Sequence, residues 1–271
     1  MSASAEWVNV GRITRNREEV DIALEVAQVR RYFGGVHAVD GASFEVEQGT
    51  ITGLIGPNGA GKSTLIDVIS GFQKPSSGRV VYHGIEIGSW PAHRVARAGL
   101  VRSFQLSSEF ARLSVMENLL TAMPDMRGST VAGALRGRRY WRSAQDAGLE
   151  RGYALLERFG LGDRADAYAG ELSGGQKRLL EIARAVAANP RMLLLDEPFA
   201  GVNPALARDV ESVLIGLRDD GLTMVLVEHD MGAIERLCDD VIVMAEGRAI
   251  ARGTMAEIVA NEEVADAYLG G

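Results

Sequence analysis

The sequence predicts an α/β fold that contains a parallel sheet and an inserted helical lobe. Short apolar runs with strand character alternate with helical periodicity up to about residue 105, and the same alternation returns after Ser173. This alternation is typical of parallel βαβ units. Between about residues 107 and 170, helical patterns predominate and no good strand is visible, which predicts a lobe of helices between two parts of the core.

The first part of the core begins with two short predicted strands and a buried strand that runs into Gly56. Apolar residues then recur at helical spacing, and Gly71 can end that helix. A hairpin and a strand ending at Gln105 complete this part. The predicted elements are strands at 22–27, 43–47 and 49–56, a helix at 62–72, a hairpin at 78–87 and a strand at 99–105.

The predicted lobe has two helical stretches, at 114–123 and 150–160, with a basic, glycine-containing segment between them. We expect this segment to form a loose excursion at about 125–145. Its run RGRRYWR, at 136–142, can be a solvated basic loop. The alternative is a contact with lipid head groups or with a membrane partner.

The second part of the core repeats the pattern of buried strands and amphipathic helices. One of its helices carries an apolar stripe of Leu206, Val210, Val213, Leu214 and Leu217. The chain should close with a single helix. The predicted elements are a helix at 175–189, a strand at 191–196, a helix at 204–221, a strand at 223–229, a further helix, a hairpin at 241–253 and a helix at 255–269.

Composition and charge exclude several classes of protein. The 271 residues carry a formal net charge of −7, which argues against broad nucleic-acid binding. No apolar run approaches the roughly 18 residues that span a bilayer, and the polar extension at 1–21 lacks the apolar segment of a secretory signal. The single cysteine, Cys238, excludes an intrachain disulfide and reads as a small core residue at a helix end. The composition fits a cytoplasmic protein.

A phosphate-binding loop follows the third predicted strand and opens a helix. The pattern G-x-x-x-x-G-K-[ST] needs this context, because its glycines let backbone N–H groups surround phosphate oxygens at a helix N-terminus. Lys62 is one of only three lysines, and a compact ammonium fits such a loop better than the broad arginine fork. We expect Lys62 to bridge the β- and γ-phosphates, Ser63 to bind Mg²⁺ and Thr64 to face the α-phosphate. The loop comprises Gly56, Pro57, Asn58, Gly59, Ala60, Gly61, Lys62 and Ser63.

Two carboxylates follow the apolar run "MLLL" at the end of another buried strand. Ligands of parallel sheets bind at this end of the strands. Because adjacent residues on an extended backbone point in opposite directions, the two acids can have different roles. We expect Asp196 to hold Mg²⁺ and Glu197 to orient the water that attacks the γ-phosphate.

Gln105 and His229 are polar residues at the tips of two further predicted strands. Either residue could simply cap a strand end. In a nucleotide site, His229 would contact the γ-phosphate and hold the water of Glu197. Gln105 would touch Mg²⁺ and report its state to the helical lobe.

The segment LSGGQ, at 172–176, precedes a long predicted helix. Ser173 is a good N-cap there, and this alone would explain the segment. Alternatively, the segment is a second phosphate-binding helix N-terminus, more than 100 residues after the first. One fold cannot easily bring both to one phosphate, whereas a two-fold dimer can. The residues concerned are Ser173, Gly174, Gly175 and Gln176.

These segments together resemble the ATP-binding subunit of an ABC transporter. The segments GPNGAGKST, LLLDEP and LSGGQ match the Walker A, Walker B and signature motifs, and Gln105 and His229 match the Q-loop and H-loop. The resemblance covers about residues 22–270. It implies a P-loop NTPase with a RecA-like core and an N-terminal antiparallel β lobe, in which 22–105 and 171–271 form the ATP-binding core and 106–170 the helical lobe.

The resemblance assigns two further positions. Phe33 matches the aromatic residue that stacks on adenine, with its neighbour Tyr32 as the alternative. Asn203 lies in the D-loop, where many ABC ATPases have aspartate. Segments such as VRSFQ, EPFAGVNP and AYLGG are closest to the larger ATPase of branched-chain amino-acid importers.

The resemblance implies an enzyme that hydrolyses MgATP as a dimer with a second ATPase subunit, identical or different. It would lie on the cytoplasmic face of the membrane, bind membrane permease subunits through its helical lobe, near residues 106–119, and work with an extracytoplasmic solute-binding protein. The resemblance implies import of branched-chain amino acids, with urea, amides or other small organic acids as alternative solutes. An ABC ATPase acting on DNA or ribosomes, a lipid-exporter ATPase, and a P-loop kinase or GTPase are the competing classes.

Overall fold

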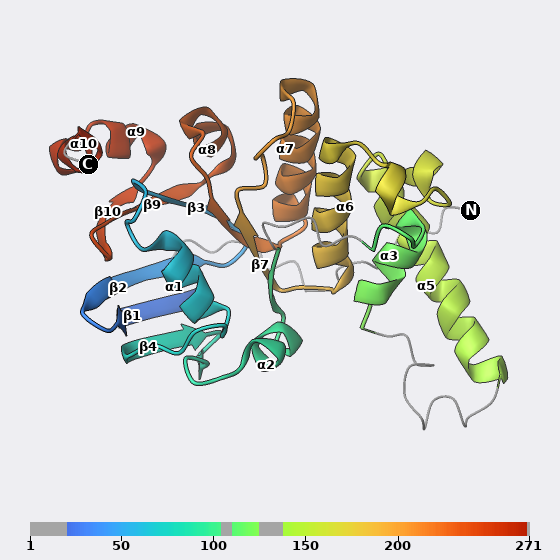
Figure 1. Ribbon diagram of the computed structural model, residues 1–271, viewed down its shortest axis with the longest axis horizontal. Coiled ribbons are helices and arrows are strands. Elements are labelled where there is room, and N and C mark those ends of the chain that lie inside the picture. The colour runs from blue at the N-terminus through green and yellow to red at the C-terminus, as the bar shows by residue number, and fades with distance from the viewer. Residues whose placement is uncertain (1–20, 104–109, 125–137, 270–271) are drawn as a thin grey trace.

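The computed structural model of the protein describes residues 21–103, 110–124 and 138–269 (Figure 1). Several expectations therefore concern residues outside this part of the chain, among them residues 106–109 of the expected permease contact. Others are most of the N-terminal extension, Gln105, and the part of the basic excursion before residue 138.

Sheet A is a four-stranded antiparallel sheet with the strand order β2-β1-β4-β5. Two short strands were expected in its first hairpin, and this was wrong, because both strands are 12 residues long. Gln28 adopts a left-handed φ of 49° at a bulge and bonds the Ser43 hydroxyl, so pairing continues across the irregularity. The strands are β1 (Ile22–Phe33), β2 (Val36–Glu47), β4 (Ser77–Tyr82) and β5 (Ile85–Glu86).

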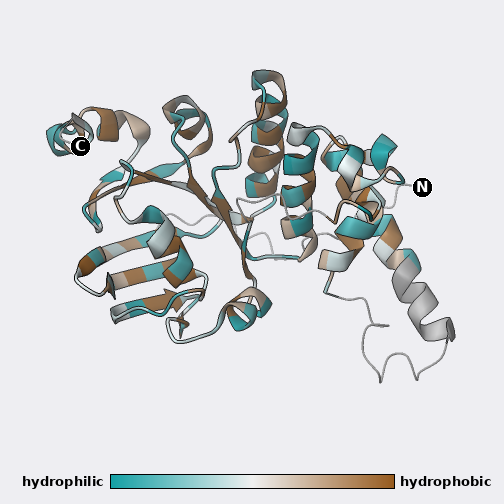
Figure 2. Cartoon of the chain, viewed as in Figure 1, coloured by the Kyte–Doolittle hydropathy of each residue, from teal (hydrophilic) through white to brown (hydrophobic). Residues whose placement is uncertain are grey.

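Sheet B has the order β10-β9-β3-β8-β7-β6, and its strands are parallel except for β10. Its central strands are buried on both faces, which explains their continuous apolar runs (Figure 2). The expected parallel sheet is confirmed. The strands are β3 (Ile51–Ile55), β6 (Leu100–Arg102), β7 (Met192–Asp196), β8 (Thr223–Val227), β9 (Asp240–Ala245) and β10 (Arg248–Gly253).

Two hydrophobic cores lie on the two faces of sheet B. Alternate residues of β7 point to opposite sides, so that Leu193 and Leu195 join one core and Leu194 the other. The second core contains residues of sheet A and of α1 (Lys62–Ile69), which lies between the two sheets (Figure 1). The first core contains α6 (Gly174–Ala187) and α7 (Pro204–Asp219).

The helical lobe packs against α6 through α3 (Val115–Ala122) and α5 (Arg138–Arg158). Two short 3₁₀ turns, η1 (Gly162–Arg164) and η2 (Ala169–Glu171), lead from α5 into α6. The loose excursion expected at 125–145 was wrong for residues 138–145, which are helical in α5.

The remaining helices are α2 (Ala92–Arg97), α8 (Met231–Leu237), α9 (Met255–Val259) and α10 (Glu262–Leu269). Of these, α8 packs over the central strand β3, α2 lies beside β6, and α9 and α10 lie beside β10. The single closing helix expected at 255–269 was wrong. The Asn261 side chain accepts hydrogen bonds from the Glu263 and Val264 amides, which starts a new helix. Within the described ranges, no helix has both the length and the apolar character needed to cross a bilayer.

Candidate functional site

The phosphate loop, Gly56–Ser63, connects β3 to α1 and is packed where only glycine fits. Gly56, Gly59 and Gly61 all have φ in the left-handed half of the map, at 148°, 82° and 94°. A Cβ on Gly56 would lie 2.1 Å from the Met244 carbonyl oxygen, and one on Gly61 would lie 2.2 Å from that of Ala38. The loop's backbone is therefore held by β9 and β2 in a shape that side chains would prevent.

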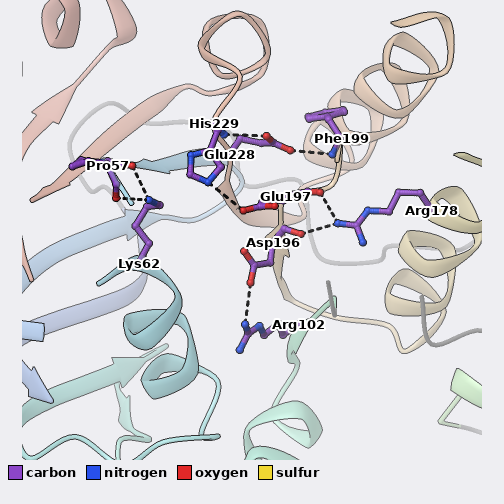
Figure 3. Close-up of polar contacts among 10 residues, drawn as sticks. Pro57, Lys62, Arg102, Arg178, Asp196, Glu197, Phe199, Glu228 and His229 are labelled. Atoms are coloured by element: carbon purple, nitrogen blue, oxygen red, sulfur yellow. Dashed lines mark hydrogen bonds and ion pairs between the residues drawn. The ribbon is translucent and has the colours of Figure 1, made fainter. Parts of the chain in front are cut away.

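Lys62 is buried inside this loop, with 6% of its surface exposed. Its Nζ donates to the carbonyl oxygens of Gly56, at 2.7 Å, and Pro57, at 3.0 Å (Figure 3). Burial lowers the pKa of Lys62, and the negative charges of Glu197 and Asp196 oppose this effect in part. A buried cation beside a loop of backbone amides is suited to bind an anion.

The N-terminus of α1 adds to this electrostatic setting. Gly61 is the N-cap and has no side chain to bond the first-turn N–H groups. Those groups and the helix dipole are thus directed at whatever lies in the loop. The Ser63 hydroxyl is at the exposed start of the same helix.

The two acids expected from the sequence lie at the carboxyl end of β7. Asp196 is 4% exposed, and its Oδ2 lies 3.0 Å from Arg102 Nη2; Arg102 also pairs with Asp67 of α1. Glu197 Oε1 lies 3.1 Å from His229 Nε2. Asp196, Glu197 and His229 therefore come together with Lys62 at one edge of sheet B (Figure 3).

One part of the geometric argument for these acids was wrong. Glu197 is not on an extended backbone, because its φ is 48°, in the left-handed region. The turn at Glu197, and not the alternation of a strand, directs its carboxylate away from that of Asp196. The Glu197 amide donates to the Val227 carbonyl oxygen at 2.8 Å, so the turn remains attached to β8.

Hard oxygen ligands for a divalent cation are available at this edge. The Asp196 carboxylate and the Ser63 hydroxyl are of the type that Mg²⁺ prefers. In the part of the chain that is described, no group of three or more His, Cys, Asp or Glu side chains could hold a metal by itself. The residues therefore fit a cation that takes its other ligands from a bound phosphate and from water.

The segment LSGGQ starts α6 and is capped by its own side chains. The Gln176 amide donates to Ser173 Oγ at 3.3 Å, and the Ser173 amide donates to Gln176 Oε1 at 3.1 Å, as in a capping box. The predicted N-cap is confirmed. Ser173 and Gly174 are exposed, and α6 and α1 lie well apart in the subunit (Figure 1). Within one subunit, LSGGQ does not approach the phosphate loop.

Of the remaining expected site residues, Phe33 and Asn203 are exposed, whereas Tyr32 and Thr64 are partly buried. Phe33, at the end of β1, is 44% exposed, with the Arg31 guanidinium 4.5 Å from its ring centre. Tyr32 instead stacks on His37 and bonds Asp40. Asn203 is the N-cap of α7, and its Oδ1 accepts from the Leu206 amide at 3.0 Å.

Four residues at the site were missed by sequence reasoning. They are Arg102, Arg178, Glu228 and Tyr268. Burial raises the pKa of Tyr268, in α10, and a hydrogen bond with the Gly56 backbone opposes this effect in part. A charged residue on the apolar face of a helix or strand is the one signal that could have revealed Arg178 and Glu228.

Glu228 is 5% exposed and lies between Val227 and His229. Burial raises the pKa of its carboxyl group; hydrogen bonds from the Phe199, His229 and Asp230 amides lower it, and the charge of Glu197 raises it further. Its oxygens accept from the Phe199 amide at 2.9 Å and the His229 amide at 3.0 Å.

The geometry defines the class first: a P-loop nucleotide-binding fold with an acidic strand end opposite the loop lysine. The family model described as "ABC transporter" matches residues 39–200, and one described as "Branched-chain amino acid ATP-binding cassette transporter" matches residues 250–271. The chain belongs to the ABC transporter family of ATP-binding cassettes. Members of this family bind and hydrolyse ATP, and the chain is an ATPase of this class.

Relatives cover nearly the whole chain. The chain is 39% identical to the "High-affinity branched-chain amino acid transport ATP-binding protein BraF" of Pseudomonas aeruginosa, over 91% of this chain and 97% of that protein. It is 36% identical to the "Probable branched-chain amino acid transport ATP-binding protein LivG" of Archaeoglobus fulgidus, over 91% and 95%. The chain is also similar to a crystal structure of a nucleotide-free ATP-binding cassette from an ABC transporter. The two sequences are 35% identical, the TM-score is 0.79, and the match covers 92% of this chain and 100% of that one.

Proposed function

We propose that this chain is the ATP-hydrolysing subunit of a transporter whose membrane-spanning subunits are separate chains, and that the complex imports branched-chain amino acids. The observation that carries the proposal is Lys62, a buried cation inside a glycine loop, facing the acids at the end of β7. The solute is inferred from the names of the relatives and from the C-terminal match at 250–271.

The residues of one subunit would divide the work of binding ATP. Lys62 would exchange its two carbonyl partners for oxygens of the β- and γ-phosphates, while Thr64 faces the α-phosphate. The exposed ring of Phe33 would stack on adenine, because Tyr32 is already engaged with His37 and Asp40. Asp196, Ser63 and Gln105 would hold Mg²⁺, which, when bound, would neutralise charge on the phosphates.

Glu197 and His229 would carry the hydrolytic step. Their contact of 3.1 Å places a carboxylate and an imidazole where both can bond one water molecule. Glu197 would orient that water toward the γ-phosphate and accept its proton, and His229 would hold both groups in register. The remaining barrier is lowered mainly by positioning and by the positive charges around the phosphates.

A second ATPase subunit, identical or different, would complete each site. Ser173 and Gly174 are exposed and lie far from the phosphate loop of their own subunit, so the first turn of α6 can cover nucleotide held by a partner. Asn203 of the D-loop would lie in the same interface. Closure of the dimer on ATP and opening after hydrolysis would drive the membrane subunits.

The complex would include permease subunits in the membrane and an extracytoplasmic solute-binding protein, and would not include nucleic acid. The ATPase would be peripheral, on the cytoplasmic face. The helical lobe exposes Phe110, Tyr153 and Tyr168, aromatic side chains of the kind that are enriched in protein interfaces. We propose this lobe as the contact with the permeases.

Two variants of the full chain test the proposal. Glu197→Gln should keep ATP affinity and trap an ATP-bound dimer, while turnover falls on the order of 100-fold or more. Ser173→Arg should prevent the ATP-driven dimer but leave ATP binding to the monomer intact. Gel filtration with and without ATP and a phosphate-release assay measure both; normal turnover of Glu197→Gln, or a normal dimer of Ser173→Arg, would refute the corresponding role.

A further inference from the structure

Glu197 holds a backbone conformation that residues with side chains rarely adopt. Its φ of 48° lies in the left-handed region, and Glu197 is one of only five non-glycine residues with positive φ in the described ranges. Such a conformation persists only where the surrounding structure over-determines it. The side chain at this position is the one that the proposed mechanism needs most.

Arg178 holds the carbonyl side of this turn. It lies in the second turn of α6, five residues after Ser173, and is 8% exposed. Its Nη2 donates to the carbonyl oxygens of Asp196 and Glu197, both at 2.7 Å, and its Nε donates to that of Pro198 at 3.1 Å. Figure 3 shows the Arg178 guanidinium beside the carbonyls of Asp196 and Glu197, and the Pro198 carbonyl is the third that it bonds.

The charge of Arg178 is balanced within its own helix. Its Nη1 lies 2.5 Å from Glu181 Oε2, and both side chains are buried. The guanidinium is therefore a fixed part of α6, held by an ion pair one turn further along. The start of α6 is thereby bonded directly to the carbonyls of residues 196–198.

Glu228 holds the amide side of the same turn. Its Oε1 accepts from the Phe199 amide at 2.9 Å, and its Oε2 accepts from the amide of His229 at 3.0 Å. One buried carboxylate thus connects the residue two positions after Glu197 with the residue that contacts the Glu197 side chain. The segment from Asp196 to Phe199 is bonded from both sides.

We infer that Arg178 and Glu228 are positioning residues that hold Glu197 in its left-handed conformation and aim its carboxylate at His229. The inference rests on the proposed function, since it assigns these residues to the hydrolytic step. It also links two sites: α6, whose first turn would cover the partner's nucleotide, is bonded through Arg178 to the Glu197 of its own subunit. Loading of one site would thereby bear on the geometry of the other.

Two variants of the full chain test the inference, one that keeps the charge of the side chain and one that keeps its shape. Arg178→Lys keeps the charge but loses the planar fork that spans three carbonyls. Glu228→Gln keeps the shape but directs an NH₂ donor at the amide of Phe199 or His229. Each variant should behave like Glu197→Gln. Its ATP affinity should stay within about threefold of wild type, an ATP-bound dimer should accumulate, and turnover should be about 10- to 100-fold lower than in wild type.

Arg236→Lys is the matched control. Arg236 also makes a two-pronged contact with a carboxylate, Glu211, at 2.6 and 3.0 Å, but touches none of residues 196–199. Its turnover should stay within about twofold of wild type. Thermal unfolding of all three variants shows which are folded at the assay temperature, and either positioning variant that is folded decides the question.

The outcomes separate the inference from the proposed function. Normal turnover of Arg178→Lys or Glu228→Gln overturns the inference. So does a phenotype like that of Ser173→Arg, with no dimer, because the residues would then support the interface and not Glu197. If the wild-type protein does not hydrolyse ATP and the Glu197→Gln variant does not form a trapped dimer, the proposed function itself fails, and the inference fails with it.

Discussion

The phosphate loop and LSGGQ are both glycine-containing turns that open a helix, but their surroundings are opposite. The phosphate loop is packed against β9 and β2, and its helix has no side-chain cap. Its lysine is buried, with carbonyl oxygens as hydrogen-bond partners. LSGGQ starts its helix with a complete capping box and exposes Ser173 and Gly174 to solvent.

This difference indicates which of the two turns has polar groups that a ligand would satisfy within one subunit. In the phosphate loop, a buried cation and uncapped amides leave electrostatic demands that an anion would satisfy within the subunit. In LSGGQ, the subunit has already satisfied the helix start, so a ligand there would come from outside and add to a stable structure. We therefore propose that the phosphate loop binds its ligand within one subunit, whereas LSGGQ contributes to a site only against a partner subunit.

The largest expected difference between the two turns concerns lysine. Lys62→Met should weaken ATP binding to the monomer by two to three orders of magnitude, because charge-assisted bonds to the phosphates are lost. The matched variant is Lys177→Met, in the helix that LSGGQ opens, which should change this affinity by less than about twofold. Calorimetric titration with ATP measures both. Equal losses in the two variants would remove the distinction.

Glycine variants give the next largest contrast. Gly61→Ala should lower the free energy of unfolding by about 2–4 kcal/mol. The reason is that alanine would have to adopt a left-handed φ of 94° and place its Cβ 2.2 Å from the Ala38 oxygen. At Gly174 a Cβ would have no atom within 4 Å, so Gly174→Ala should change the free energy of unfolding by no more than about 1 kcal/mol. Urea unfolding compares them. A Gly174→Ala variant as unstable as Gly61→Ala would show that LSGGQ is under similar strain.

A smaller effect is expected from the cap itself. Ser173→Ala removes the hydroxyl that accepts from the Gln176 amide, which should cost about 1 kcal/mol of stability. ATP affinity of the monomer should not change. Denaturant unfolding and ATP titration of the same preparation test this pair of statements, and a loss of monomer affinity would place LSGGQ in the subunit's own site.

The smallest effect concerns Cys238, whose Sγ would lie 3.1 Å from a Cβ on Gly53 of β3, the strand that leads into the phosphate loop. Burial raises the pKa of its thiol to about 12, with the charges of Asp239 and Asp240 adding to this. At pH 8 the reactive thiolate is therefore scarce, and labelling by Ellman's reagent should be slower than in the urea-unfolded chain. Gly61→Ala should speed labelling, whereas Gly174→Ala should not. Rapid labelling of the folded wild type would contradict this.

Local patterns predicted much of the fold and the site. The apolar runs of β3, β7 and β8 showed the parallel sheet, because strands buried on both faces must be apolar throughout. The phosphate loop and the pair Asp196–Glu197 were visible because each is a continuous segment at the end of such a run. Ser173 was recognised as a cap from its position alone.

Features that depend on distant contacts were missed or wrong. The break between α9 and α10 depends on one Asn261 side chain within a helical pattern. The length of β1 and β2 depends on bulges that pairing tolerates. Arg102 lies 94 residues from its partner Asp196 along the chain, and no local pattern announces such a pair.

The sequence alone determined the chemistry that this protein can perform, since a phosphate loop, an acidic strand end and a helix cap are each encoded in a few neighbouring residues. The tertiary structure decided how these parts are aimed. It folded Lys62 into its loop, turned Glu197 into a left-handed conformation toward His229, and bonded that turn to Arg178 and Glu228. Apart from the local bonds of Lys62, these contacts join segments that are 18 or more residues apart in sequence, so only the packed chain can define them.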